Sequence, residues 1–227
     1  MEADERPSPP DRDDHPERED RAPERGAPEH DDRHFPIVGI GASAGGIEAL
    51  TAFFEHLPDE RENMAFVVVQ HLSPEHESRL AELLGEHTAM YVTQVSETTA
   101  LQPGHVYVIP PDKNLSITDD ELTPSEFEQP RTKRAPVDFF FRTLAETHGE
   151  RAVGILLSGT GTGGTQGLGR IKERGGVTMV QDPDEAGYSG MARSAIAANL
   201  VDVVAPVAEL AEQLADQIGR ASCRERV

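Results

Sequence analysis

Three almost purely apolar stretches constrain the fold of this chain more than any other feature. They read FPIVGIG from Phe35, MAFVVVQHL from Met64 and AVGILLSG from Ala152, and each precedes a segment with apolar residues at helical spacing. Strands that are apolar on both faces belong to mostly parallel sheets that helices cover on both sides. We therefore predict an α/β fold: a doubly wound, mostly parallel sheet in a Rossmann-like, three-layer arrangement.

The segments between these strands add detail to this prediction. GIEALTAFFEHLP predicts a helix that ends before Pro58, with one apolar stripe formed by Ile47, Leu50, Phe54 and Leu57. PVDFFFRTLAETHG predicts another, with Pro136 in its first turn and Gly149 after its end. Further helices are expected in ESRLAELLGEH, LGRIKERGG, GMARSAIAANL and VAELAEQLADQ, and further strands in MYVTQVS, HVYVIPP, LSIT, VTMVQD and VDVVAP.

The two ends of the chain differ from this pattern. Residues 1–34 hold thirteen acidic residues and six arginines with almost nothing apolar, so we predict a disordered acidic arm there. The folded domain is predicted over residues 35–217. Residues 218–227, IGRASCRERV, differ in composition from the rest of the chain, which is acidic and has no cysteine. They match a translation of a common sequencing-library adapter. We interpret them as a non-native tail; a natural basic tail is the alternative.

Charge and composition exclude several classes of function. A formal net charge of −20 argues against binding to nucleic acid or to anionic membranes. No stretch reaches the ~18 apolar residues of a membrane span, and no basic-then-apolar signal peptide opens the chain, so we expect a cytoplasmic protein. One cysteine, Cys223, excludes an internal disulfide and argues against a zinc cluster. An acidic surface of this kind fits either an ordinary soluble protein or one adapted to high salt.

In parallel α/β folds the functional site lies beyond the carboxyl ends of the strands, which selects the loops after Ile40, Gln70 and Leu157. The first loop, GIGASAGG, fits only the permissive form of the dinucleotide-binding fingerprint. The second strand also ends in Gln70 and His71 rather than near the acidic residue that would bind a ribose. Nucleotide binding therefore remains a weak alternative for this loop.

The second interpretation of the first loop makes Ser43 a nucleophile on a strand-to-helix turn, with a helix-capping serine as the plain alternative. A serine nucleophile needs a base, and His71 at the end of the second strand is the candidate. The third loop, LSGTGTGGTQG, would supply the carboxylate that orients the histidine, but it contains no acidic residue.

Together these loops resemble the catalytic domain of chemotaxis protein-glutamate methylesterases (CheB-type). The family's G-A-S-x-G-G loop, which carries the nucleophile, is matched by Gly41 to Gly46, and its Q-H motif, which carries the base, by Gln70-His71. PGHVYVIPPDKNL, RAPVDFFF and GMARSAIAANLVD also look like family segments in family order. The resemblance implies hydrolysis of glutamyl methyl esters on methyl-accepting chemoreceptors, with glutamine deamidation in some members.

The resemblance also implies roles for individual residues. Ser43 would attack the ester and His71 would accept its proton, with Thr160 and Met191 as candidates for the oxyanion and substrate loop. No cofactor or metal is implied. The family's third loop carries the triad aspartate, and the residue at that position here is Gly163. A second departure is that the family's G-M-P-R reads Gly190 to Arg193 as GMAR.

Three explanations of Gly163 remain open: a degenerate and slow or non-catalytic domain, replacement by another acid such as Asp182, or a sequence error. Residues 1–34 are also too few and too polar to form the receiver domain that regulates many members. This absence and the LSGTG segment favour a methylesterase/methyltransferase hybrid, with a methyltransferase domain following in cis. The alternative of a different class is a non-catalytic module that binds receptor tails through the same cleft.

Overall fold

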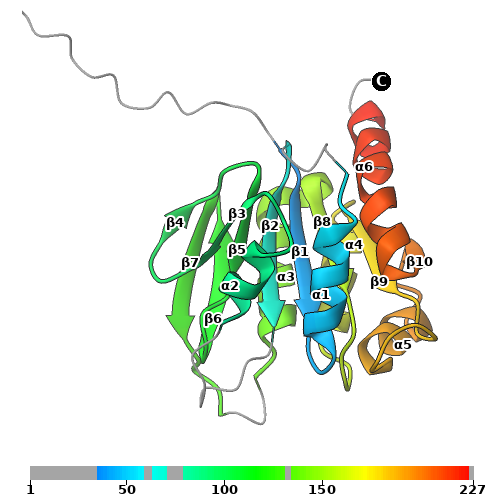
Figure 1. Cartoon of the computed structure of the whole chain (residues 1–227), viewed down its shortest axis with the longest axis horizontal. Coiled ribbons are helices and arrows are strands. Elements are labelled where there is room, and N and C mark those ends of the chain that lie inside the picture. Colours follow the sequence, from blue (N-terminus) through cyan, green and yellow to red (C-terminus); the bar gives the residue numbers. More distant parts are fainter. Residues whose placement is uncertain (1–34, 59–62, 71–78, 131–133, 225–227) are drawn as a thin grey trace, which may run out of the picture. The chain divides into compact units, whose positions relative to one another are not determined.

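The computed structural model describes residues 35–58, 63–70, 79–130 and 134–224 (Figure 1). Its main sheet has the strand order β10-β9-β8-β1-β2-β5-β3, and all its neighbouring strands run parallel. The strands are β1 (Ile37–Ala42), β2 (Ala65–Gln70), β3 (Tyr91–Gln94), β5 (His105–Val108), β8 (Ala152–Leu156), β9 (Val177–Gln181) and β10 (Val203–Ala205). The predicted parallel sheet is confirmed, with the three apolar stretches as its central strands β8, β1 and β2.

Helices cover both faces of this sheet (Figure 1). The front layer in Figure 1 contains α1 (Gly46–Glu55), α2 (Leu80–Gly85) and α6 (Val207–Arg224), whose apolar residues share one core cluster. The opposite layer contains α3 (Pro136–His148), α4 (Thr165–Glu173) and α5 (Gly190–Ala197), which share a second cluster. A 3-10 turn, η3 (Gly149–Arg151), links α3 to β8. This arrangement is the predicted doubly wound α/β fold.

A second, antiparallel sheet was not predicted as such. It consists of β4 (Thr99–Ala100), β7 (Glu121–Glu126) and β6 (Lys113–Thr118), in that order. The expected strand LSIT forms part of β6. The strand β7 escaped prediction because its sequence, ELTPSE, buries only Leu122 and therefore shows no apolar run.

Two glycines in β1 let α3 pack closely against the sheet. A Cβ on Gly41 would lie 2.4 Å from Cγ1 of Val137 and 2.8 Å from Cδ2 of Leu156. A Cβ on Gly39 would lie 3.0 Å from the rings of two α3 phenylalanines. Both glycines lie within β1, so helix packing accounts for the G-x-G pattern that had suggested a phosphate loop.

Several details of the helices differ from the sequence-based prediction. Ile47 is 42% exposed, because the buried face of α1 follows Ala49, Leu50, Phe53 and Phe54 at helical spacing. The helix α4 begins at Thr165, three residues before the predicted LGRIKERGG segment. The helix α6 continues beyond Gln217 to Arg224. The origin of residues 218–227 and the predicted domain limits at 34 and 217 stay predictions.

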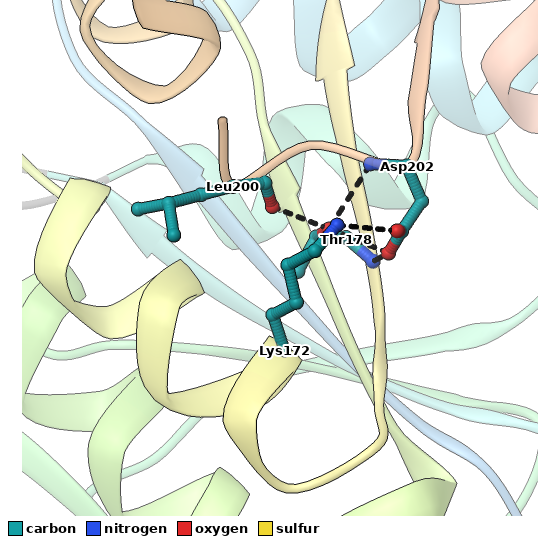
Figure 2. Close-up of polar contacts among 4 residues, drawn as sticks. All are labelled: Lys172, Thr178, Leu200 and Asp202. Atoms are coloured by element: carbon teal, nitrogen blue, oxygen red, sulfur yellow. Dashed lines mark hydrogen bonds and ion pairs between the residues drawn. The ribbon is translucent and has the colours of Figure 1, made fainter. Parts of the chain in front are cut away.

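The link between β9 and the segment before β10 depends on Asp202 (Figure 2). Its carboxylate accepts hydrogen bonds from the Thr178 backbone N–H at 3.0 Å, the Thr178 hydroxyl at 2.7 Å and the Lys172 ammonium at 2.6 Å. Burial opposes ionisation of this carboxyl, but the bonds from Lys172 and Thr178 and the charge of Lys172 outweigh burial and hold the pKa of Asp202 below its usual range. The ionised carboxylate therefore ties α4 and β9 together.

Candidate active site

Ser43 follows β1 directly and lies on the turn into α1. Its backbone N–H donates to the carbonyl oxygen of Ser158 at 3.0 Å, and its own carbonyl accepts the N–H of Gly46 at 2.9 Å. Gly45, the N-cap of α1, has a φ of 68°, a left-handed conformation that glycine adopts at little cost. The sequence therefore folds the chain sharply enough to present Ser43 at the carboxyl edge of the sheet.

The side chain of Ser158 holds this turn in place. Ser158 lies just after β8 and is 1% exposed. Its hydroxyl donates to the carbonyl oxygen of Ala44 at 2.8 Å and accepts the backbone N–H of Tyr188 at 3.0 Å. One hydroxyl thus joins the Ser43 turn to the loop before α5. The sequence analysis missed this residue, although it is the serine of the LSGTG segment.

A cavity of about 430 Å³ opens beside Ser43. Among the residues that line it are Ser43, Thr160, Gly163 and Met191, which were all singled out from the sequence. The Ser43 hydroxyl makes no hydrogen bond with a residue in the described part of the chain. The structure therefore places Thr160, Gly163 and Met191 around the same cavity as Ser43, whose hydroxyl has no partner among the described residues.

The predicted base, His71, lies outside the described residues. The residue before it, Gln70, ends β2 and pairs in register with Ala42, the last residue of β1. The Gln70 amide also donates to the Ser43 carbonyl oxygen at 3.4 Å. The chain thus leaves β2 beside the Ser43 turn, while the position of the imidazole and its role stay a prediction.

Gly163 stands in the loop between β8 and α4, on the wall of the Ser43 cavity. A Cβ built on it would have no other atom within 4 Å, in contrast to its neighbour Gly164, whose Cβ would lie 2.4 Å from Leu156. The φ of Gly163 is not in the left-handed range, whereas that of Gly164 is 82°. The backbone at position 163 therefore accommodates a side chain that projects into open space.

Comparison with known proteins identifies this arrangement. The family model described as CheB methylesterase matches residues 38–214, most of the chain. The chain belongs to the CheB methylesterase family.

Individual relatives agree with this assignment. The chain is 33% identical over 180 residues to a putative protein-glutamate methylesterase/protein-glutamine glutaminase of Leptospira interrogans, covering 79% of this chain and 93% of that protein. It is 36% identical over 182 residues to protein-glutamate methylesterase/protein-glutamine glutaminase 1 of Xanthomonas campestris, covering 78% of this chain but only half of that protein. The crystal structure of the Thermotoga maritima CheB methylesterase catalytic domain matches with a TM-score of 0.72 at 28% identity, covering 79% of this chain and 97% of that one.

In the described part of this CheB-family domain, the carboxylate that lines the cavity is Asp138 of α3. Its two oxygens accept the backbone N–H groups of Gly164 and Gly167, at 2.9 and 2.8 Å. It thereby caps α4 and fixes the loop that carries Gly163. Asp182, the substitute considered from the sequence, does not line the cavity; its carboxylate accepts the N–H of Asp184 at 2.8 Å. The signal for Asp138 was its place in the family-like segment RAPVDFFF.

The donors available in the cavity can be assigned from the backbone hydrogen bonds. The N–H of Met191 donates to the carbonyl oxygen of Gly159 at 3.1 Å, so Met191 contributes its buried side chain to the cavity wall rather than a free donor. The N–H groups of Ala44 and Thr160 donate to no described residue. Thr160 lines the cavity, and Ala44 lies next to Ser43 on the turn before α1, so these two amides are candidate donors to an oxyanion.

The described segments of the chain contain no helix that is long and apolar enough to cross a membrane. They contain no group of three or more His, Cys, Asp or Glu side chains placed to hold a metal ion.

Proposed function

We propose that this CheB-family domain hydrolyses glutamyl methyl esters on chemoreceptors, and that it also has the capacity to deamidate receptor glutamines. The observation that carries the proposal is the uncommitted hydroxyl of Ser43 on the wall of a cavity, beside the strand end from which His71 follows. Membership of the family and the relatives' names support the choice of substrate. No cofactor or metal takes part in the proposed reaction.

The proposed mechanism is acyl transfer in two steps. The Ser43 oxygen attacks the ester carbonyl while His71 accepts the hydroxyl proton, and the carbonyl π electrons move onto the oxygen. The N–H groups of Ala44 and Thr160 are the proposed donors to this oxyanion. Collapse expels methanol, which takes the proton from His71. A water molecule then attacks the acyl-serine in the same way and releases glutamate and free Ser43.

The glycine at position 163 limits the rate of this chemistry. Without a carboxylate, nothing at the triad position fixes the tautomer of His71 or stabilises its protonated form. Loss of the correct tautomer costs about 10⁴-fold in kcat in a serine protease triad, while the remaining groups keep some activity over water. We do not assign the role of the missing acid to Asp138, because its two oxygens hold the backbone N–H groups of Gly164 and Gly167 and thereby fix the loop.

The proposed partner is a methylated chemoreceptor, and the proposed compartment is the cytoplasm. The hybrid hypothesis adds a methyltransferase domain in cis, beyond the residues of this chain. Genomic sequence past codon 217 tests it: an open frame that encodes a methyltransferase-like α/β domain is expected, and a stop codon within a few residues would refute it.

A second candidate function follows from the same glycine: a non-catalytic module that binds receptor tails in this cavity. A fluorophosphonate probe separates the two. If Ser43 is a nucleophile, mass spectrometry finds the adduct on the peptide that contains it, and Ser43→Ala abolishes the adduct. Ser116→Ala, which removes a hydroxyl in the second sheet away from the Ser43 turn, is the matched serine control and should still be labelled. A protein that binds receptor tails but shows no adduct on Ser43 would favour the binding module.

A further inference from the structure

A second hollow adjoins the Ser43 cavity and is lined by three arginines. It has a volume of about 510 Å³ and lies between β7, α3 and α4. We call it the arginine groove and define it by Arg134, Arg142, Arg170, Phe127, Phe139 and Gln166. Arg134, Ala135, Asp138 and Gln166 line both hollows, so the groove adjoins the Ser43 cavity. A polypeptide whose one side chain enters the cavity is therefore close enough to contact the groove with its flanking residues.

Two of these arginines lie over aromatic rings. The guanidinium carbon of Arg134 is 4.2 Å from the ring centre of Phe127, and that of Arg142 is 5.2 Å from the ring centre of Phe139. Stacking on a ring orients a guanidinium while its N–H groups stay free for an anion. Less side-chain entropy is then lost when a carboxylate binds, which makes such arginines better anion receptors than flexible ones.

The described lining of the groove holds three arginines and three acids, so it is formally neutral in a chain whose net charge is −20. Arg142 makes no ion pair with a described residue, and the pair of Arg170 with Glu173 leaves both side chains about 60% exposed, a kind of pair that is worth little. The groove also has carboxylates. Glu126 pairs with Lys113, whereas Glu128 and Asp138 make no ion pair with a described residue and keep their negative charges; the two hydrogen bonds that Asp138 accepts come from neutral backbone N–H groups.

The overall charge of the chain makes this groove unusual. With a net charge of −20, the chain as a whole repels an acidic partner. The proposed reaction turns a neutral ester into a glutamate carboxylate, so a substrate with several modified positions becomes more acidic at each turnover. An enzyme of this charge needs local cations where such a substrate approaches.

We propose that the arginine groove binds acidic side chains that flank the reacting glutamyl ester, and that Arg142 and Arg170 thereby set the preference for acidic substrate segments. The inference rests on the proposed esterase function, since it assigns the substrate's flanking residues to that site. Arg134 is paired with Asp112 and lines both hollows, so we do not assign it to substrate binding.

The test uses the full chain and two peptides of equal length with one central glutamate γ-methyl ester. One has glutamates on both sides of the ester and the other has alanines. Methanol release gives kcat/KM for each, in low salt and in 0.5 M KCl. Loss of one exposed charge pair corresponds to about a 2- to 5-fold change, so Arg142→Gln should lower the acidic-to-neutral ratio by that factor and Arg142→Gln/Arg170→Gln by about tenfold. The ratio should also fall at high salt.

The matched control is Arg174→Gln, because Arg174 is exposed, lies on the same chain segment as α4 and does not line the groove. It should leave the ratio unchanged. If both peptides are hydrolysed and the acidic-to-neutral ratio of kcat/KM is unchanged in the Arg142 variants, the proposed role of the groove is wrong and the proposed esterase activity stands. A rise in both rates would overturn it too, because the chain's own acidic segment 1–34 would then be the occupant.

A measurement of peptide binding tests the role of the groove independently of the proposed esterase activity. Fluorescence anisotropy with the labelled acidic peptide is measured on the full-length Ser43→Ala variant, alone and combined with Arg142→Gln. A Kd that rises about 2- to 5-fold with Arg142→Gln supports the groove even if no ester is hydrolysed. A Kd that does not change contradicts it whether or not esters are hydrolysed.

Discussion

The hydroxyl of Ser158 donates a 2.8 Å hydrogen bond to the carbonyl oxygen of Ala44, the residue that follows Ser43. The backbone carbonyl oxygen of Ser158 accepts the N–H of Ser43 at 3.0 Å. The turn that presents Ser43 is therefore held from two sides by one buried residue at the end of the neighbouring strand. We expect the position of the Ser43 hydroxyl and of the nearby amides to depend on this residue.

Removal of this hydroxyl should affect both stability and reaction rate. In Ser158→Ala the Ala44 carbonyl and the Tyr188 N–H lose their partner, which should cost about 1–3 kcal/mol of unfolding free energy. With a small neutral ester, kcat should fall more than KM rises, because the Ser43 turn loses its support. The control Ser116→Ala removes an exposed hydroxyl and should change little. Equal losses in the two variants would contradict the positioning role.

The close packing of α3 on β1 predicts a steric penalty at Gly41. Gly41→Ala places a methyl group 2.4 Å from Val137 and should destabilise the fold by about 1–3 kcal/mol through overpacking. Chemical denaturation measures this. Gly85→Ala is the matched control: its Cβ meets nothing within 4 Å, and alanine favours the helix by up to about 1 kcal/mol. A Gly41→Ala protein as stable as the parent would show that α3 does not pack as described.

The buried imidazole of His148 predicts a loss of stability in mild acid. Burial lowers the pKa of His148, against the hydrogen bond and charge of Asp120 and the charge of Asp119, which raise it; Arg151 lowers it further. Below the unfolded-state pKa of about 6.5, the unfolded chain takes up a proton before the folded one. The free energy of unfolding should therefore fall as the pH drops from about 6.5 toward the folded-state pKa.

Denaturation curves between pH 8 and 5 test this effect against His148→Gln, which removes the titrating group. The decline of stability over this range should be smaller in the variant than in the parent. An identical decline in both proteins would assign the acid sensitivity to other groups.

Much of the fold could be predicted because burial on both faces leaves continuous apolar strands in the sequence. The strand β7 was not predicted, because only Leu122 is buried in it. Ile47 was assigned to the buried face of α1 but is exposed, because apolar residues at helical spacing can also fit a face next to the buried one. Which face of α1 is buried depends on the elements that pack against the helix, and the sequence of the helix alone does not contain this information.

The site was partly predictable for a similar reason. Parallel strands end at one edge, which made it possible to expect that the loops of Ser43 and Gly163 meet. Ser158 and Asp138 could not be found this way, because each acts by accepting or donating to the backbone of another segment. Such contacts depend on the folded path of the main chain and leave no periodic signal.

We propose that Ser43 performs the ester hydrolysis and that Gly163 occupies the position of the triad acid. Methanol release from a glutamate γ-methyl ester peptide tests both roles. It is measured for the parent and for Gly163→Asp, each with and without the additional substitution Ser43→Ala. Position 163 has room for the side chain. We predict that Gly163→Asp raises kcat by up to about 10⁴-fold, and that this gain disappears when Ser43→Ala is added. Equal rates for the parent and Gly163→Asp, or a gain that survives Ser43→Ala, would contradict it.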